Sequence, residues 1–484
     1  MPVARKIAYN VVFNSLFKVF STVVLSLYSI RLITEYLGPD GFGKYATILA
    51  FFAFFSALVD LGLAQVTVRE ISREGADEKS IFGKIFTLRL LSSSAIIIVA
   101  PLVLFFFNYE KDLKIGILFA AVAVFFSSAS LLLNGIFQKN LAMDRVAMVE
   151  FFGKFLQVVL VTLIVKNDLG FLAIASTLLA SLSFNAIIVF FLSRSFVRFG
   201  LDWDVTYWKN FLRESSPLAA TAMITFAYFK LDTIILSVLK TSADVGIYNV
   251  AYKIMENLIF FPAMLAGLIL PLLSRTLFTD RELFEDIVDK TFKVFLLIVF
   301  PLVVGTWVLA PEIITIISGS GFGESARVLR ILAFALGCIF FVFFFSLLPL
   351  VSNAQKKLMK ALIIAAIFNI GINFIFIPKY SYIGAAFVSL ATEFLVVILL
   401  SALAFREIRF RPSFKPVFPI SVATLLMGGA MYIFDHFSFI VAGVAGVVAY
   451  MVGLWLTKVV TYREIRMIFS NKDTEPILTD GPIS

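Results

Sequence analysis

The sequence has very little of what metal centres and catalytic triads are made from. It contains one cysteine, Cys338, which excludes a disulfide within the chain and any cysteine-based metal site. Its one histidine, His436, argues against a histidine-ligated metal centre and against a catalytic triad. It also lacks a Walker A pattern and a soluble domain large enough to bind ATP. We therefore expect a protein that is not an enzyme and that holds neither a metal nor a cofactor.

Charged residues are also scarce. They make up 15% of the 484 residues, whereas a soluble protein has about 25%. Hydrophobic residues account for 60%, there are 56 phenylalanines, and the mean hydropathy is +0.98. A chain this apolar can hide its side chains only in lipid. The net charge of +9 does not indicate nucleic-acid binding, because the basic residues form short clusters between apolar runs, as in membrane loops. The composition predicts an all-α integral membrane protein.

Apolar runs long enough to cross a bilayer recur along the whole sequence. A spanning helix needs about 20 mostly apolar residues. The first run is longer than the apolar core of a cleaved signal peptide and lacks a cleavage motif, so we interpret it as a transmembrane helix. Fourteen spans are predicted, at residues 11–33, 45–68, 85–107, 115–137, 146–166, 170–193, 216–239, 246–273, 291–317, 327–351, 361–378, 383–404, 417–435 and 438–458.

The basic residues orient these helices. An even number of spans puts both termini on the same side of the membrane. Most of the 41 Lys and Arg residues lie in the termini and in alternate loops. The loops on the opposite side hold six, which are Lys44, Lys111, Lys114, Lys166, Lys240 and Lys379. The positive-inside rule therefore predicts a multi-pass protein of the inner (cytoplasmic) membrane with both termini in the cytoplasm.

The second half of the sequence repeats features of the first. Gly43-Lys44-Tyr45 opens the second span, and Gly246-Ile247-Tyr248 opens the eighth, 203 residues later. Two sets of six spans in the same orientation indicate parallel repeats, which can rock about a central site in alternating access. The predicted parts are an N-lobe (1–193), a cytoplasmic linker (194–215), a C-lobe (216–404), and helices 13 and 14 with a cytoplasmic tail (405–484).

Three segments carry a family resemblance. Residues 366–386, AIFNIGINFIFIPKYSYIGAA, resemble the eleventh-to-twelfth helix signature of polysaccharide flippases. Residues 37–45, LGPDGFGKY, resemble the first outer loop of that family, and DLGL at 60–63 followed by Arg69-Glu70 resembles the end of its second helix. The chain is thus similar, over nearly its whole length, to the Wzx-type branch of the multidrug/oligosaccharidyl-lipid/polysaccharide exporter superfamily. The resemblance implies that it moves polyprenyl-diphosphate-linked oligosaccharides from the cytoplasmic to the outer leaflet.

Basic residues inside the predicted spans are the candidate substrate site. Ionisable groups in a bilayer are costly and usually face a cavity or a partner. A lipid diphosphate needs cations on its way across, and both Lys and Arg bind phosphate. We expect a cationic cavity formed by Lys18, Arg31, Arg89, Lys154, Lys230 and Lys253. Lys230 is the best single candidate, because it lies near the middle of the seventh span.

Simpler roles are open for some of these residues. Arg31 and Arg89 lie near span ends and can equally snorkel to the headgroups. Pairing of Lys154 with Glu150, or of Lys253 with Glu256, on one helix face is as plausible as substrate contact.

Carboxylates in or near the spans are candidates for ion coupling. A carboxylate in a low dielectric can bind and release H⁺ or Na⁺. The candidates are Asp60, Asp232, Glu256 and Glu393. The driving force is an ion gradient or the substrate gradient, and the sequence leaves the ion open. Asn369 and Asn373 lie one helical turn apart, where they can bind sugar hydroxyls or pack between helices, and we favour packing.

Other functions stay open. A lipid II flippase shares the fourteen-helix plan and the cationic cavity, but its second helix carries a long Arg-rich motif that this sequence lacks. A multidrug exporter of the same superfamily usually stops at twelve spans and has an acidic cavity. A scaffold or glycosyltransferase subunit of a polysaccharide assembly complex is a third alternative, although a membrane polymerase is expected to carry a large polar outer loop. The expected partners are a lipid-linked oligosaccharide, membrane lipids, and a polysaccharide polymerase with its assembly machinery, without nucleic acid.

Overall fold

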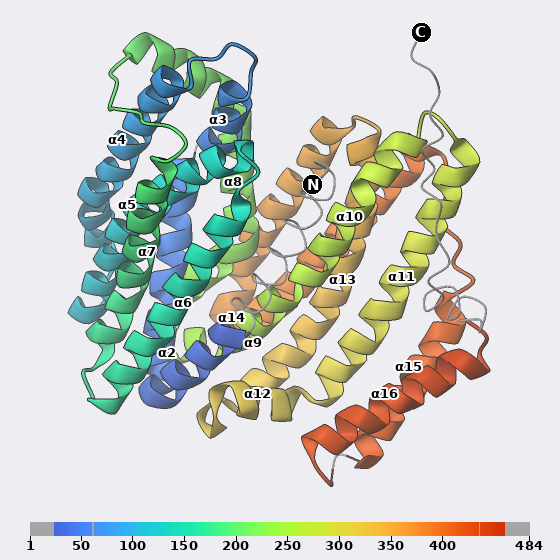
Figure 1. Ribbon diagram of the computed structural model, residues 1–484. Helices are drawn as coiled ribbons and strands as arrows, with labels where there is room; N and C mark the ends of the chain where they lie inside the picture. The colour runs from blue at the N-terminus through green and yellow to red at the C-terminus, as the bar shows by residue number, and fades with distance from the viewer. Residues whose placement is uncertain (1–23, 61, 435, 460–484) are drawn as a thin grey trace. The chain divides into compact units, whose positions relative to one another are not determined.

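The computed structural model describes residues 24–60, 62–434 and 436–459. Within this part of the chain every regular element is a helix and no strand occurs (Figure 1). Twelve helices among the described residues, with α9 and α10 counted as one, are long and apolar enough to cross a membrane. The predicted all-α membrane fold is confirmed.

The described helices follow one another with short connections. They are α2 (Ser26–Asp60), α3 (Leu63–Ile71), α4 (Glu78–Phe105), α5 (Lys111–Lys139), α6 (Met143–Lys166), α7 (Phe171–Ser193), α8 (Val205–Leu239), α9 (Ser242–Leu258), α10 (Phe260–Thr276), α11 (Arg281–Val308), α12 (Ala310–Ser318), the 3-10 helix η2 (Ser320–Phe322), α13 (Ser325–Val351), α14 (Gln355–Ile408), α15 (Val417–Phe434) and α16 (Phe439–Leu456).

Two of the helices each contain residues of two predicted spans, joined by a kink. In α2 the kink is at Gly38, whose φ of 65° and ψ of −174° suit only glycine, and Pro39 follows it. In α14 the kink is at Ser381, which has a φ of 49° and lies between the predicted spans 361–378 and 383–404. The fourteen expected spans therefore correspond to these twelve helices, although the second is divided between α2 and α3 and the eighth between α9 and α10. Most of the first expected span, residues 11–23, lies outside the described residues.

The ninth predicted span, 291–317, differs from the structure in one respect. It is divided after Val308 into α11 and the short helix α12. Pro311 lies at the second position of α12, where its missing N–H has no helical partner to lose and its fixed φ favours a new helix. The division thus follows from the local sequence.

The chain forms two compact units. The first contains α2 to α9, the start of α10, and α12 to α14, and the second contains the rest of α10 with α11, α15 and α16. In the second unit, the Tyr450 hydroxyl of α16 donates to the Leu297 carbonyl of α11 at 2.9 Å. The predicted division into N-lobe, linker, C-lobe and tail stays a prediction.

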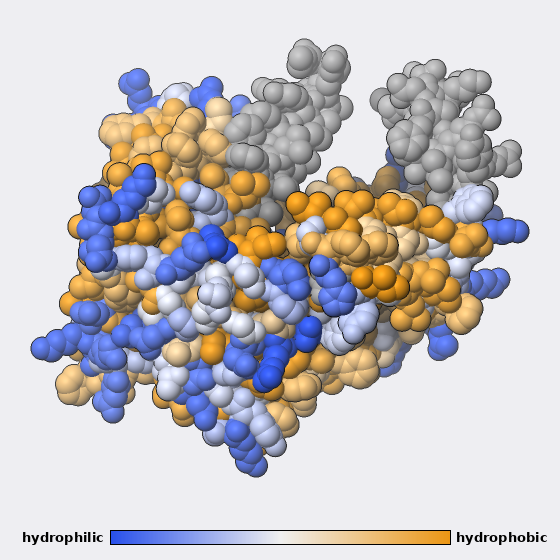
Figure 2. Space-filling view, turned by 90° about the horizontal axis from the view of Figure 1, so that it is seen from below, coloured by the Kyte–Doolittle hydropathy of each residue, from blue (hydrophilic) through white to orange (hydrophobic). Residues whose placement is uncertain are grey.

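The surface has the polarity of a membrane protein. Large apolar side chains in the spans are exposed, such as Ile98 in the first unit (71%) and Leu425 in the second (72%). Such exposure fits contact with lipid, because soluble proteins rarely leave so much apolar surface in water. Figure 2 views the molecule from below, and hydrophilic side chains gather over the helix ends of the first unit there.

The two glycines of the repeated Gly-x-Tyr motif meet in the first unit. A Cβ at Gly43 of α2 would lie 1.7 Å from the carbonyl oxygen of Ser242 in α9. A Cβ at Gly246 of α9 would lie 2.1 Å from the carbonyl oxygen of Pro39 in α2. The backbones of the two helices therefore touch at these glycines, and any side chain there would separate them.

Candidate functional site

Two lysines pair with one glutamate inside the membrane-spanning part of the first unit, and a third lysine lies within electrostatic range of one of them. Lys154 belongs to α6, Lys230 to α8, and Lys253 to α9 together with Glu256. The Lys230 Nζ lies 2.9 Å from Glu256 Oε1, and the Lys253 Nζ lies 2.7 Å from Glu256 Oε2. The charge of Lys154 is close enough to that of Lys253 for the two to repel each other. We call Lys154, Lys230 and Lys253 the lysine cluster.

The local sequence explains how these groups come together. Lys253 and Glu256 are three residues apart on one face of α9. Tyr252, next to Lys253, makes a cation–π contact with Lys230, whose Nζ lies 4.8 Å from the centroid of the tyrosine ring. The Tyr252 hydroxyl donates to the Phe229 carbonyl of α8 at 2.5 Å. The face of α9 thus holds Lys230 by both a carboxylate and an aromatic ring.

The cluster lies deep in the expected bilayer and is not sealed. Lys230 is nine residues, or about 13 Å, from the nearer end of its span at Leu239. The side chains of Lys230, Lys253 and Glu256 are 19%, 26% and 38% exposed, so all three are partly accessible. Three lysines face two carboxylates, because Asp232 also lies within electrostatic range of Lys230. An anion such as a diphosphate would offset the remaining positive charge. The suggested Lys253–Glu256 pair is present, and Lys230 shares its carboxylate.

Lys154 connects the cluster to α2. Its Nζ donates to Gln157 Oε1 at 2.9 Å, and Gln157 Nε2 donates to the Tyr45 hydroxyl at 3.5 Å. Tyr45 is the tyrosine of the first Gly-x-Tyr motif. Lys18, the remaining lysine of the expected cavity, lies outside the described residues.

Arg89 is not brought to the lysine cluster. It is 1% exposed, and its guanidinium donates to the carbonyls of Val59 at 2.5 Å, Asp60 at 2.9 Å and Ser128 at 3.3 Å. Val59 and Asp60 end α2, where carbonyls have lost their helical partners. The Asp60 carboxylate lies 3.6 Å from the same guanidinium. Arg89 therefore joins α4 to the end of α2 and to α5.

Arg31 is also engaged elsewhere. It pairs with Glu35, one turn later on α2, and donates to the carbonyls of Thr315 and Ile316, the latter at 2.8 Å. These carbonyls lie in the last turn of α12, where a cation is favoured by the helix dipole. Arg31 thus joins α2 to α12.

Asp232 is buried in a polar network between α8, α9 and α14. It is 4% exposed, accepts from the Tyr248 hydroxyl, and accepts from the Thr233 backbone N–H at 2.6 Å. The Tyr248 hydroxyl is 3.1 Å from Ser389 Oγ of α14. The sequence did not single out Tyr248 as a partner, although a buried tyrosine hydroxyl usually needs one.

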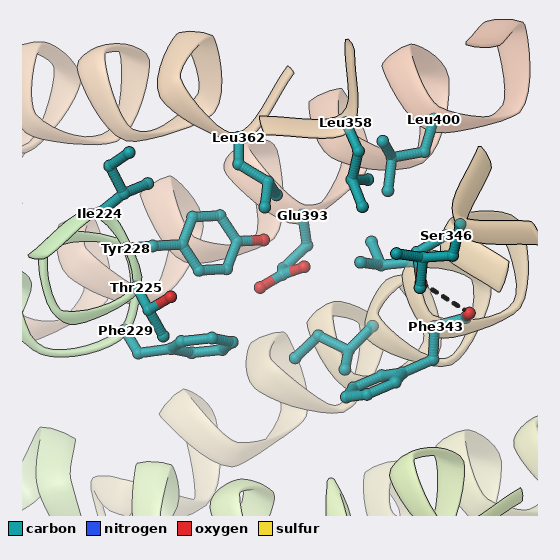
Figure 3. A pocket seen from close by; sticks show the side chains of 13 residues that line it. Ile224, Thr225, Tyr228, Phe229, Phe343, Ser346, Leu358, Leu362, Glu393 and Leu400 are labelled. Carbon is teal, nitrogen blue, oxygen red and sulfur yellow. Dashed lines mark hydrogen bonds between the residues drawn. The ribbon is translucent and has the colours of Figure 1, made fainter. Parts of the chain in front are cut away.

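Glu393 reaches into a cavity of about 230 Å³ between α8, α13 and α14. It is 6% exposed, and in the described part of the chain neither its Oε2 atom nor the Tyr228 hydroxyl has a hydrogen-bond partner. Figure 3 shows the carboxylate beside that hydroxyl, among apolar side chains such as Leu362. A smaller cavity of about 10 Å³ is lined by both Glu393 and Asp232. It has room for about one water-sized species.

The two asparagines pack the halves of α14 against each other. Asn369 Nδ2 donates to Thr392 Oγ1 at 3.1 Å, and Asn373 Nδ2 donates to Asn369 Oδ1 at 2.9 Å. Both side chains are buried. Asn369 also lines the small cavity shared by Asp232 and Glu393.

Comparisons with known proteins agree with this architecture. Residues 32–327 match the model of the family described as polysaccharide biosynthesis protein. The chain is 24% identical over 458 residues to the "probable low-salt glycan biosynthesis flippase Agl15" of Haloferax volcanii, which covers 90% of this chain and 92% of the relative.

Solved structures share the fold. A lipid II flippase MurJ in an inward closed conformation superposes with a TM-score of 0.79 at 17% identity, covering 94% of this chain and 99% of that one. An inward-facing multidrug resistance MATE family transporter of the MOP superfamily superposes with a TM-score of 0.65 at 16% identity, covering 80% and 96%. Since the family model matches well over half of the chain, the protein belongs to the polysaccharide biosynthesis protein family, and its fold is that of the multidrug/oligosaccharidyl-lipid/polysaccharide exporter superfamily, as the resemblance predicted.

Proposed function

We propose that the protein is a flippase that carries a polyprenyl-diphosphate-linked oligosaccharide from the cytoplasmic to the outer leaflet by alternating access. The observation that carries this proposal is the lysine cluster around Glu256, deep in the spans. Membership of a polysaccharide biosynthesis family and the similarity to a protein named as a glycan biosynthesis flippase support it.

The charge of the cluster suits a diphosphate. An unpaired charge in the bilayer costs several kcal/mol, so the headgroup needs cations where it crosses. One carboxylate holds both Lys230 and Lys253, so a diphosphate can take one lysine while Glu256 retains the other. The partial exposure of the cluster leaves a way in for the headgroup, and the polyprenyl chain stays in lipid.

The experiment is leaflet-specific transport in proteoliposomes that contain the lipid-linked oligosaccharide of the source cells. Lys230→Gln should lower the initial rate at least about tenfold, a change of about 1.4 kcal/mol in the barrier. The matched control is Lys290→Gln, because Lys290 is 73% exposed and pairs with Asp286 in the second unit. Equal rates for wild type and protein-free liposomes would refute the function, and an unimpaired Lys230→Gln would remove Lys230 from the site. Faster transport of lipid II would reassign the substrate.

We also propose that Asp232 and Glu393 bind the coupling cation, H⁺ or Na⁺. Both carboxylates are buried, both line the same small cavity, and one oxygen of Glu393 has no partner among the described residues. Imposed proton and sodium gradients should distinguish the ions, because only the coupled one will accelerate wild-type transport. Asp232→Asn and Glu393→Gln should abolish that acceleration. A transport rate that neither the proton nor the sodium gradient changes would contradict the proposed ion coupling.

A further inference from the structure

A third pocket, of about 530 Å³, lies at the end of the first unit that is expected from the charge distribution to face the outside of the cell. Three segments form it: the start of α2 after its kink, the α4–α5 connection, and the α8–α9 junction. Its volume falls within the range of about 300 to 1,000 Å³ that is usual for small-molecule sites. We call it the loop pocket.

The loop pocket has a rigid aromatic wall. Phe107 and Tyr109 are stacked, with ring centroids 5.3 Å apart and planes at 6° to each other. Phe51 of α2 meets both rings edge-on, at 5.6 and 6.1 Å. The Tyr109 hydroxyl is 2.8 Å from Ser237 Oγ of α8, and burial raises the pKa of Tyr109 to about 12. The ring therefore stays neutral and is held in place from two sides.

The charges that line the loop pocket offset each other. Lys44 Nζ lies 3.2 Å from the Asp40 carboxylate and 2.7 Å from that of Glu110. Lys240, the other basic residue of the lining, donates to the Pro378 carbonyl at 2.9 Å. Two positive and two negative groups thus give the lining no net charge. In this respect the loop pocket is unlike the lysine cluster, which carries an excess of positive charge.

The remaining polar groups suit a ligand with many hydroxyls. Asn108 and Ser242 line the pocket, and so does Thr241, whose hydroxyl is bonded to Asp244. Amide and hydroxyl groups both donate and accept hydrogen bonds. An uncharged sugar ring matches this set, because its hydroxyls also donate and accept while its C–H face can pack on an aromatic ring. A phosphate would find no excess of cations here.

We propose that the loop pocket binds a neutral sugar unit of the lipid-linked oligosaccharide on the outer side of the membrane. This proposal rests on the proposed function and on the orientation expected from the basic loops. Along α8, Lys230 precedes Ser237 and Lys240 by seven to ten residues, which is about 10 to 15 Å. The diphosphate and the glycan of one substrate molecule would thus bind at separate sites of different charge, the lysine cluster and the loop pocket.

The test uses saturation-transfer difference NMR on the full-length protein in nanodiscs. The probes are free glucose, galactose, mannose and N-acetylglucosamine, with glucuronic acid as an anionic comparison. Val238→Trp should fill the pocket, because Val238 lines it and is 50% exposed. Leu239→Trp is the matched control, since Leu239 is 40% exposed and does not line the pocket. Wild type and Leu239→Trp should show transfer to at least one neutral sugar, and Val238→Trp should lose it.

Three results would overturn the proposal: no transfer to any neutral sugar, equal transfer in Val238→Trp, or transfer to glucuronic acid alone. Transport measurements distinguish failure of the pocket proposal from failure of the proposed flippase function. Val238→Trp should slow the oligosaccharide-carrying lipid about tenfold, or about 1.4 kcal/mol, and leave sugar-free polyprenyl diphosphate unchanged. Equal transport of both lipids would refute the pocket alone. If wild type moves neither lipid, the flippase function fails, while sugar binding that depends on Val238 would still support the pocket.

Discussion

Replacing Glu256 with glutamine removes the charge that the lysine cluster shares and keeps the size of the side chain. In the structure this carboxylate accepts from Lys230 at 2.9 Å and from Lys253 at 2.7 Å. With the carboxylate gone, both lysines are free to bind the substrate's diphosphate. We therefore expect Glu256→Gln to bind the substrate more tightly and to release it more slowly.

The magnitude follows from one of these two contacts, the one that the diphosphate must break in wild type to take a lysine from Glu256. A hydrogen bond to a charged group contributes about 1.5 to 3 kcal/mol. The side chains are 19% to 38% exposed, so solvent screens part of this energy and the lower end of the range applies. At about 1.4 kcal/mol for each factor of ten, KM should fall about tenfold. Where release limits turnover, kcat should fall by a similar factor.

The assay is the initial transport rate in proteoliposomes at several concentrations of lipid-linked oligosaccharide. Glu285→Gln is the control, because Glu285 belongs to a surface pair with Arg281 in the second unit. Unchanged KM and kcat in Glu256→Gln would refute the reasoning. A higher KM would mean that Glu256 contacts the substrate itself.

Three other substitutions address separate parts of the structure. Arg89→Gln should lower the free energy of unfolding by about 3 to 5 kcal/mol, because a buried charged network loses its donor; thermal unfolding in nanodiscs measures this. Gly246→Ala should keep α2 and α9 apart, because its Cβ would lie 2.1 Å from the Pro39 carbonyl oxygen; distances between spin labels on the two helices report it. The hydrogen bond from Lys84 lowers the pKa of Asp204, so this carboxylate stabilises the fold above about pH 4 and the stabilisation is lost as the pH falls through the folded pKa. Asp204→Asn should remove this contribution, which acid unfolding followed by circular dichroism will show.

Each of these expectations has a control or a contrary outcome. Gly371→Ala should leave the spin-label distance unchanged, because a Cβ there meets no atom within 4 Å. An Arg89→Gln protein as stable as wild type would mean that other groups satisfy the carbonyls at the end of α2. An acid transition unaltered in Asp204→Asn would contradict the role of the Lys84–Asp204 pair.

The spans could be predicted because lipid imposes a length and a polarity that the sequence must satisfy residue by residue. The breaks near Gly38 and Ser381 were also predicted as the ends of spans. That one helix continues across each kink could not be predicted, because the glycine, proline and polar residues there are equally typical of a loop. The depth of Lys230 was likewise readable from its place in the span. Its partner Glu256 was not, because the two residues are 26 positions apart on consecutive helices and only packing decides which helix faces meet.

Arg89 illustrates the same limit of prediction from sequence. Because it lies near a span end, Arg89 was expected either to line the substrate cavity or to reach the lipid headgroups. The structure gives it the carbonyls at the end of α2, which need a donor because the helix stops there. That need arises from the break before Gly62, whose φ is 68°, and it becomes visible only when α2 and α4 lie together.

The contact between Gly43 and Gly246 is reciprocal. Each glycine faces the carbonyl of the residue four positions before the other, Ser242 in one direction and Pro39 in the other. A contact in which residue i meets j and j meets i is isologous, the kind that two copies of one chain make about a twofold axis. The predicted repeat would account for this symmetry, because equivalent glycines of its two halves would then meet each other.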